Sequence, residues 1–173
     1  METTTVETKT GKGACGGGIG GLACSAYRVL SWLAPIADLA ARLWVANAFF
    51  KSGLTKIQSW SSTLALFEYE YEVPLLPPSL AAVLGTAAEL ALPVLISVGL
   101  ATRLSALALF LLNIVAVYAY GSYLFSTEGA VGLQEHILWG LMIAMILFHG
   151  PGKLSLDHLI ARRFGRGSNG GIA

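Results

Sequence analysis

A long, almost uncharged stretch in the middle of the chain limits what this sequence can fold into. From Leu75 to Phe125 the only charged residues are Glu89 and Arg103. At a helical rise of about 1.5 Å per residue, a stretch of this length can cross a bilayer twice. Arg103 lies where two such crossings would meet, whereas Glu89 falls within the first. The sequence therefore predicts an integral membrane protein, and a carboxylate at that depth is where function should first be sought.

Four apolar segments are candidates for membrane helices. None of them alternates with the period of two that marks the strands of a membrane barrel. The composition agrees, because 55% of the residues are hydrophobic, above the roughly 45–50% of soluble domains. We expect an all-α membrane protein, a four-transmembrane-helix bundle with a short cytoplasmic amphipathic helix at the C-terminus. The expected membrane helices are Ile36 to Leu54, Leu80 to Leu100, Leu104 to Leu124 and Val131 to His149.

The two ends of the chain differ in composition from the membrane segments. We expect residues 1–30 to form a flexible, glycine-rich cytoplasmic leader, residues 36–164 the membrane domain and residues 165–173 a flexible tail. The leader carries Cys15 and Cys24. Their spacing matches neither a zinc site nor a CxxC pair, so we expect two free thiols without an assigned role.

A polar segment, residues 55–79, separates the first two apolar segments. In its acidic run Glu68, Glu70 and Glu72 alternate with two tyrosines, and three prolines follow. We expect an external loop whose aromatic side chains lie at the membrane surface, although the alternation is also typical of a short strand.

The distribution of basic residues predicts the orientation in the membrane. With four crossings, eight Lys and Arg residues share one side, whereas two share the other side with five glutamates. The positive-inside rule therefore places both termini in the cytoplasm. A net charge of +1 argues against a nucleic-acid partner. The larger basic group is Lys9, Lys12, Arg28, Arg103, Lys153, Arg162, Arg163 and Arg166.

Charged residues on the first two helices are expected to meet inside the bundle. Asp38 and Arg42 share a stripe of the first helix that continues to Gly53 and Lys56. On the second helix, Pro93 has no N–H to offer the carbonyl of Glu89. Because the two helices are antiparallel, we expect Arg42 to pair with Glu89. The pair is interpreted either as an ion pair that only fixes helix packing or as a substrate, quinone or proton site.

The third and fourth helices add further polar residues. A single Asn113 within the membrane is interpreted as a contact between helices in preference to a ligand contact. Gln134, Glu135 and His136 are interpreted as a solvated helix start, with a metal site or proton relay as the alternative. We predict that one polar cavity, the only one in the bundle, is lined by Arg42, Glu89, Asn113 and Trp139.

The sequence contains no recognisable catalytic or cofactor motif. It has no HExxH, no CxxC pair and no P-loop, and no flavin or nucleotide domain. Its three histidines, His136, His149 and His158, are spread between the two membrane faces, so no metal site is expected within one chain. No intrinsic cofactor is expected either. A redox role would therefore need the cofactor of a partner or a lipid-soluble quinone.

The end of the last apolar segment reads His149-Gly150-Pro151-Gly152-Lys153-Leu154-Ser155-Leu156-Asp157. Together with Arg42, Glu89 and Gly99-Leu100-Ala101-Thr102-Arg103, this sequence closely resembles the DoxX family of small bacterial membrane proteins. The resemblance covers about Asp38 to Asp157 and implies a four-helix fold in the inner membrane. The family-like residues are Gly53, Lys56, Arg103, Gly150, Pro151, Gly152, Ser155 and Asp157.

The same ending also has a physical interpretation. Pro151 and its flanking glycines stop the membrane helix, and Ser155 or Asp157 can N-cap a short helix from Leu156 to Phe164. Three arginines, Arg162, Arg163 and Arg166, would hold that helix against anionic headgroups. The alternative is a docking surface for a cytoplasmic partner.

The resemblance also implies a function. DoxX-like proteins are similar to a subunit of thiosulfate:quinone oxidoreductase and to membrane partners of redox and thiol-stress systems. We therefore expect an accessory subunit of a redox or stress-related membrane assembly, without catalytic activity of its own. A quinone-linked oxidoreductase subunit and an accessory to small-solute or metal transport are the alternatives. The expected partners are the lipid bilayer and either another protein or a second copy of the chain.

Overall fold

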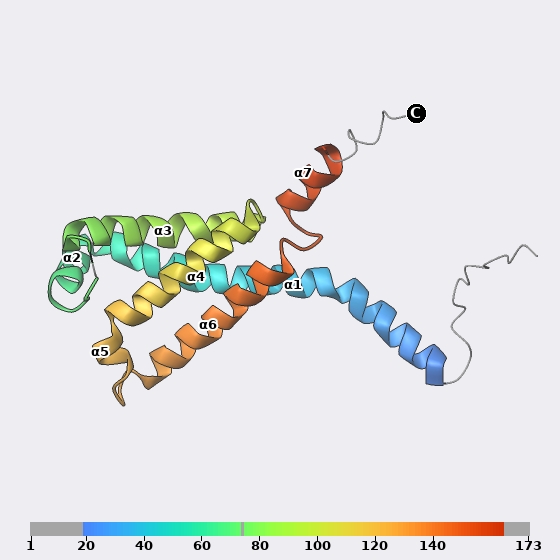
Figure 1. The fold of residues 1–173 in the computed structure, drawn as a ribbon, viewed down its shortest axis with the longest axis horizontal. Coiled ribbons are helices and arrows are strands. Elements are labelled where there is room, and N and C mark those ends of the chain that lie inside the picture. The colour runs from blue at the N-terminus through green and yellow to red at the C-terminus, as the bar shows by residue number, and fades with distance from the viewer. Residues whose placement is uncertain (1–18, 74, 165–173) are drawn as a thin grey trace, which may run out of the picture. The chain divides into compact units, whose positions relative to one another are not determined.

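The computed structural model describes residues 19–73 and 75–164 (Figure 1). Cys15, Lys9, Lys12, Arg166 and the predicted C-terminal tail lie outside these residues. The chain divides into two compact units, Met1–Ala34 and Pro35–Ala173. Helix α1 (Ile19–Gln58) runs through the boundary between them, and Pro35 lies inside this helix.

The first unit is described only by the beginning of α1. Large apolar side chains are exposed here, including Leu22, Tyr27 and Trp32. The Ser31 hydroxyl donates to the carbonyl of Tyr27 at 2.7 Å. Cys24 is disulfide-bonded, so the expectation that it is a free thiol is wrong.

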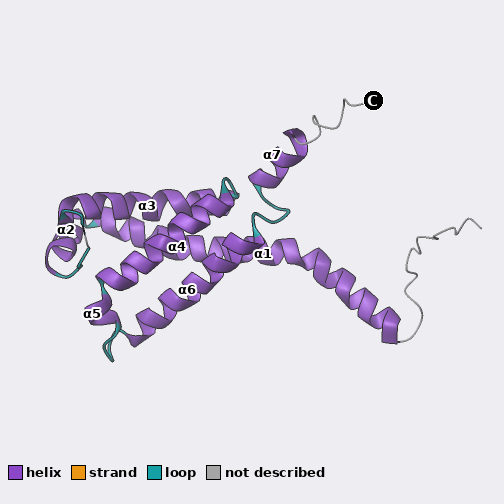
Figure 2. Ribbon diagram, in the orientation of Figure 1, coloured by secondary structure: helices purple, strands orange, loops and turns teal. Residues whose placement is uncertain are grey.

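The second unit contains the rest of α1 and six further helices, and its described residues form helices and loops without strands (Figure 2). Helix α4 packs against both α3 and α6, and α2 packs against α3. Within residues 19–73 and 75–164, four helices are long and apolar enough to cross a membrane, which confirms the expected all-α membrane bundle. The helices after α1 are α2 (Trp60–Tyr69), α3 (Pro78–Val98), α4 (Thr102–Ala119), α5 (Gly121–Leu124), α6 (Ala130–His149) and α7 (Leu156–Phe164).

Several predicted boundaries differ from the structure. Helix α1 begins at Ile19, well before the predicted start at Ile36. The segment predicted as an external loop contains α2, and no strand forms in its described part. The third membrane helix ends at Ala119 instead of Leu124, and the separate short helix α5 follows it. The predicted C-terminal helix is confirmed as α7.

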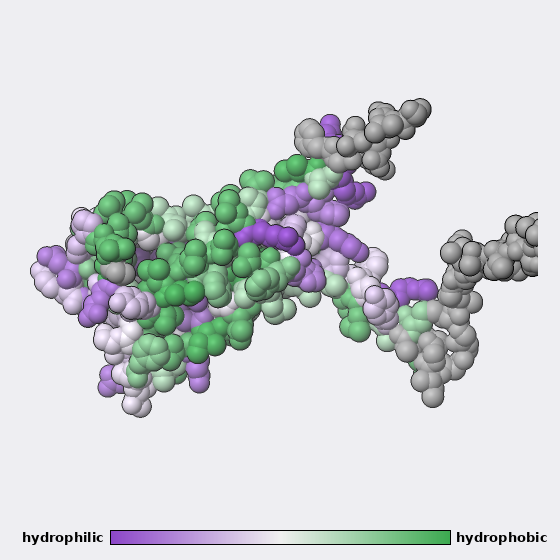
Figure 3. All heavy atoms as spheres, in the orientation of Figure 1, coloured by the Kyte–Doolittle hydropathy of each residue, from purple (hydrophilic) through white to green (hydrophobic). Residues whose placement is uncertain are grey.

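The core of the second unit is apolar and lies where α1, α3, α4 and α6 meet. Its buried members are Val45, Phe49, Ile96, Ala106, Leu109, Ile143 and Ile146. The face in Figure 3 shows hydrophobic residues over the middle of α3, α4 and α6 and hydrophilic residues toward the ends of these helices. Such an apolar outer surface is what contact with lipid requires, since a soluble domain of this size rarely exposes one.

Candidate functional site

An ion pair joins α1 to α3 inside the bundle. The Lys56 ammonium donates to both Glu89 carboxylate oxygens, at 2.8 Å and 2.7 Å, and to the Ser52 hydroxyl at 2.8 Å. Only 14% of the Lys56 side chain and 13% of the Glu89 side chain are exposed. Each charge alone would cost roughly 2.5–3.5 kcal/mol at the centre of a membrane helix, so pairing is the cheapest arrangement for both. The prediction that Arg42 pairs with Glu89 is therefore wrong.

Gly53 explains why α1 and α3 come this close. A Cβ at this position would lie 2.9 Å from the Leu90 side chain and 3.2 Å from the Glu89 Cβ. Distances this short leave no room for a larger residue between the two helices. The absent side chain at Gly53 thus lets Lys56, three residues further along α1, reach the Glu89 carboxylate.

The ion pair lines a cavity of about 360 Å³, which we call the membrane cavity. Most of its lining is apolar. Among the lining residues, Leu76, Leu84 and Val115 are 39%, 50% and 42% exposed, so one side of the cavity lies at the outer, lipid-facing surface. Its polar lining residues are Ser52, Lys56, Tyr71, Glu89, Tyr120 and His136.

His136 reaches the membrane cavity from α6 and is fixed there by Asn113 of α4. The His136 ring Nδ1 lies 2.8 Å from the Asn113 Oδ1, and the Asn113 amide donates to the His136 carbonyl at 3.0 Å. The prediction of Asn113 as a contact between helices is confirmed. His136 is half-buried, so its interpretation as part of a solvated helix start is wrong, whereas Gln134 and Glu135 are exposed.

Trp139 supports His136 from one turn further along α6. Its ring meets the His136 ring edge-on with centroids 5.0 Å apart, and the Phe49 ring of α1 with centroids 5.6 Å apart. Neither Trp139, Asn113 nor Arg42 lines the membrane cavity, so the predicted grouping of these three residues with Glu89 in one cavity is wrong. Among the described residues no cluster of three metal-ligating side chains occurs.

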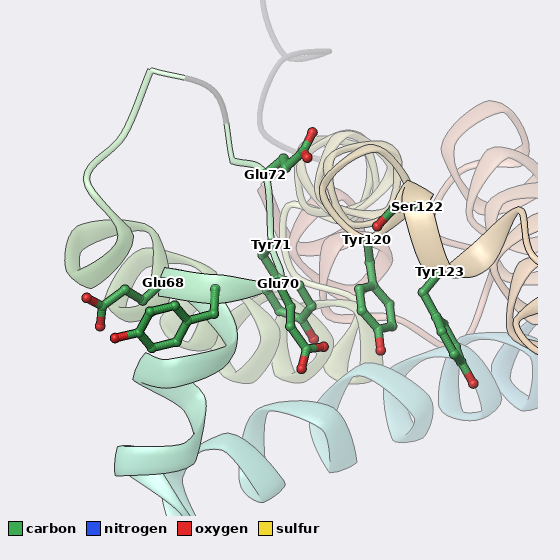
Figure 4. A pocket seen from close by; sticks show the side chains of 8 residues that line it. Glu68, Glu70, Tyr71, Glu72, Tyr120, Ser122 and Tyr123 are labelled. Atoms are coloured by element: carbon green, nitrogen blue, oxygen red, sulfur yellow. The ribbon is translucent and has the colours of Figure 1, made fainter.

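A second pocket, the outer pocket, lies at the end of α2 and measures about 360 Å³ (Figure 4). The Tyr71 and Tyr120 rings pack edge-on with centroids 5.1 Å apart, and Tyr120 stacks on Tyr123 at 4.9 Å. The backbone N–H of Glu72 donates to the carbonyl of Ala119 at 2.9 Å, which ties the segment after α2 to the end of α4. The pocket is lined by Glu68, Tyr69, Glu70, Tyr71, Glu72, Tyr120, Ser122 and Tyr123.

The two tyrosines that pack edge-on have raised pKa values. Burial raises the pKa of Tyr71 first, and the nearby Tyr120, Glu89 and Glu70 raise it further. Burial also raises the pKa of Tyr120, together with Glu70, Tyr123 and a hydrogen bond to the Glu70 carboxylate. Both hydroxyls therefore keep their protons at neutral pH and remain hydrogen-bond donors.

Arg42 lies near the opposite end of the bundle, about 21 Å from Lys56 along α1 at the usual helical rise. It is 1% exposed, and its guanidinium donates to the carbonyl of Leu154. Gly99 ends α3 with φ of +71° and leaves space for this group, because a Cβ there would lie 2.5 Å from the Arg42 Nη1. Arg42 thus joins α1 to the segment before α7.

The family-like ending forms a strap, residues 149–157, across this end of the bundle. The Asp157 carboxylate accepts bonds of 2.8 Å from the Ala101 N–H, the Thr102 N–H and the Thr102 hydroxyl, and thereby caps α4. The Asp157 N–H donates to the Gly99 carbonyl at 2.9 Å. Ser155 caps α7 instead, since its hydroxyl accepts the His158 N–H at 3.1 Å.

The remaining strap residues pack against charged side chains. Gly150 and Gly152 have φ of +95° and +67°, and a Cβ would lie 3.4 Å from the Arg103 guanidinium at the first and 3.1 Å from an Asp38 oxygen at the second. The glycines on either side of Pro151 therefore permit both the turn and these approaches. His149 lies 3.6 Å from the Asp38 carboxylate.

The pKa of Asp157 reflects its position in the strap. Burial acts to raise this pKa, but the hydrogen bonds from Thr102 and Ala101 and the charge of Arg42 together hold it below the ordinary value. The ionised carboxylate is thus the form that binds the end of α4.

Comparison with known proteins places the chain in a family. The DoxX family model matches residues 37–122, which contain Arg42, Gly53, Lys56, Glu89 and Asn113. An uncharacterized protein of Haemophilus influenzae is 30% identical over 126 residues, 72% of this chain and 83% of that protein. The chain belongs to the DoxX family. No solved structure matches it.

Sequence reasoning missed part of the site in this DoxX protein. Lys56 was placed on the correct stripe of α1, but its long side chain and the close approach at Gly53 were not used to pair it with Glu89. Tyr71 and Tyr120 are far apart in the sequence, and no local pattern indicates that both line the membrane cavity and the outer pocket. The tyrosines beside Glu70 and Glu72 were the one available signal.

Proposed function

We propose that this DoxX protein is an accessory subunit of a redox-linked assembly in a bacterial inner membrane and that it binds a quinone in the membrane cavity. The observation that carries the proposal is the membrane cavity itself. It combines an apolar lining and a lipid-facing side with a small set of hydrogen-bonding groups. Such a mixture suits a lipid-soluble ring that carries polar oxygens.

The polar groups match the chemistry of a quinone. Each of its two carbonyl oxygens accepts hydrogen bonds, and the cavity is lined by two tyrosines, Tyr71 and Tyr120, whose hydroxyls can donate. The mostly apolar remainder of the lining suits the ring and the start of its isoprenoid tail. Electrons would come from a cofactor-bearing partner subunit, because the sequence has no flavin or nucleotide domain.

Quinone retention through purification tests the proposal. The protein is purified in mild detergent, and extracted quinone is quantified by its absorbance against the protein concentration. Gly85 lines the cavity, and a Cβ there already touches the Phe67 ring at 3.5 Å, so Gly85→Leu fills the space that a ring would occupy. The matched control is Ala87→Leu, which adds the same side chain to an exposed position of α3.

The outcomes separate clearly. We expect quinone to be retained by the wild-type protein and by Ala87→Leu, and to be lost from Gly85→Leu although that variant elutes as a folded protein. Wild-type protein without quinone, which also fails to take up a short-chain quinone added to the detergent, would contradict the proposal.

A further inference from the structure

We propose that Tyr71 and Tyr120 form a proton path between the outer pocket and the membrane cavity, from Glu70 to Glu89. The two tyrosines line both spaces, so a single pair of side chains separates solvent-exposed carboxylates from a carboxylate inside the bundle. The path rests on the proposed function only for its purpose, which is to supply protons to a ligand in the cavity.

The outer half of the path is visible in Figure 4. Glu70, Tyr71, Tyr120 and Tyr123 follow one another across the pocket, and the Glu70 carboxylate lies on the side to which the Tyr120 hydroxyl points. Burial raises the pKa of that hydroxyl, and the nearby Glu70 carboxylate raises it further. Glu70 is exposed, so its carboxylate exchanges protons with bulk water.

The inner half of the path runs through the membrane cavity. Tyr71 lines both pockets, and its pKa is raised by burial first and then by Tyr120, Glu89 and Glu70. A cavity of about 360 Å³ has room for several waters, since one water needs on the order of 10–15 Å³ of such volume and two to four polar partners. Waters held by Tyr71, His136 and the Lys56–Glu89 pair can complete the chain of hydrogen bonds.

The chemistry favours protons as the transported species. A tyrosine hydroxyl both donates and accepts, so it can release its proton toward the cavity as it receives one from the outer side. One proton leaves Glu70 and one arrives at Glu89, while neither tyrosine changes its charge. A quinone that receives two electrons from the partner's cofactor would take up two protons by this route.

The groups that face Glu89 come from every element around the cavity. Lys56 of α1 neutralises it, Tyr71 follows α2, Tyr120 follows α4, and His136 approaches from α6. Lys56 holds both carboxylate oxygens, so protonation of Glu89 must weaken that pair.

The rate at which Glu89 follows a change of pH tests the path without any quinone. The protein is placed in lipid nanodiscs, the buffer is stepped to acid, and the carboxyl band of Glu89 is followed by time-resolved infrared spectroscopy. The Lys56→Met/Glu89→Gln variant, which lacks both charges, identifies the band. Tyr71→Phe/Tyr120→Phe keeps the packed rings and removes only the two hydroxyls.

In the Tyr71→Phe/Tyr120→Phe variant, we expect the Glu89 carboxyl band to change roughly a hundredfold more slowly after the pH step. This factor is the lower end of what a positioned proton donor contributes. Tyr120→Phe alone, the second variant if the first does not fold, should also slow this change. The matched control Tyr123→Phe removes a hydroxyl from a ring that stacks on Tyr120 but does not line the membrane cavity, and should leave the rate unchanged.

Two results would overturn the path. The first is a Glu89 band that changes as fast in Tyr71→Phe/Tyr120→Phe as in the wild type, which would mean that protons reach Glu89 by another route. The second is equal slowing in Tyr123→Phe, which would assign the effect to loosened ring packing. Because the readout is the protonation of Glu89 and no electrons are supplied, neither result depends on whether the membrane cavity binds a quinone.

Discussion

At the scale of single residues, the partner of Glu89 decides where the polar site of this protein lies. Arg42 and Lys56 lie on one stripe of α1, so helical periodicity alone cannot choose between them. The choice is made by Gly53, which brings α3 against α1 beside Lys56, and by Gly99, which receives the Arg42 guanidinium at the other end. Gly53 thus determines where the Lys56–Glu89 pair forms, whereas Gly99 makes room for an arginine that joins α1 to the segment before α7.

We predict strong coupling between Lys56 and Glu89. Removal of one partner of a buried ion pair costs roughly 3–5 kcal/mol, and we expect about 3 kcal/mol for either Lys56→Met or Glu89→Gln. The double variant should lose far less than the sum, because no lone charge remains. Unfolding free energies measured by denaturant titration in detergent micelles would show this non-additivity.

Arg42 supplies the control for that cycle. Arg42→Met combined with Glu89→Gln should be additive within about 0.5 kcal/mol, since the two residues lie apart and share no partner. Coupling of Arg42 to Glu89 as strong as that of Lys56 would contradict the pairing described above.

At the scale of elements, the strap joins three helix ends through one residue, Asp157. Asp157 lies in the first turn of α7 but bonds the first residues of α4 and, through its N–H, the end of α3. The orphan N–H groups at the start of α4 are thereby satisfied by a residue more than fifty positions away. Local sequence rules assign such a residue to its own helix.

We predict that acid loosens this strap. Because the pKa of Asp157 is lowered in the folded protein, its stabilising effect is complete above the ordinary pKa of an aspartate and is lost as pH falls through the lowered value. The protein is briefly exposed to acid, crosslinked while still in acid, and then digested with trypsin at neutral pH. Cleavage after Lys153 should be faster than in protein that was never exposed to acid.

Asp157→Asn should show fast cleavage at neutral pH and little further change after acid exposure. Glu135→Gln, which alters an exposed carboxylate near the start of α6 and away from the strap, serves as the matched control and should keep the wild-type dependence on acid. Cleavage of Asp157→Asn at the wild-type rate would exclude a role for this carboxylate in holding the strap.

The elements differ in how far the sequence could predict them. Three membrane helices follow directly from apolar runs, and α7 follows from its capping residues, because both signals are local. Helix α2 lies inside the segment predicted as an external loop, where the alternation of Glu68, Glu70 and Glu72 with tyrosines left a short strand as the alternative. Helix α1 begins well before the predicted Ile36 and continues through Pro35.

At the scale of the whole molecule, the candidate site and the basic residues occupy different ends of the bundle. The outer pocket carries Glu68, Glu70 and Glu72, whereas the strap and α7 carry Lys153, Arg162 and Arg163. This separation could be predicted from sequence because charges near segment ends alternate sides with each crossing. That Tyr71 and Tyr120 line both the membrane cavity and the outer pocket could not be predicted, because it depends on distances between side chains from different parts of the chain.

We predict that the outer pocket faces the periplasm and that α7 faces the cytoplasm. The positive-inside rule favours cytoplasmic placement of the end that carries Arg103 and the α7 arginines, and the glutamates at the other end do not oppose it. A periplasm-active reporter inserted at Glu70 should therefore be active, and the same reporter fused after Phe164 should be silent. The inverse pattern would place Glu70 in the cytoplasm, so that any protons reaching Glu89 through Tyr120 would come from that side instead.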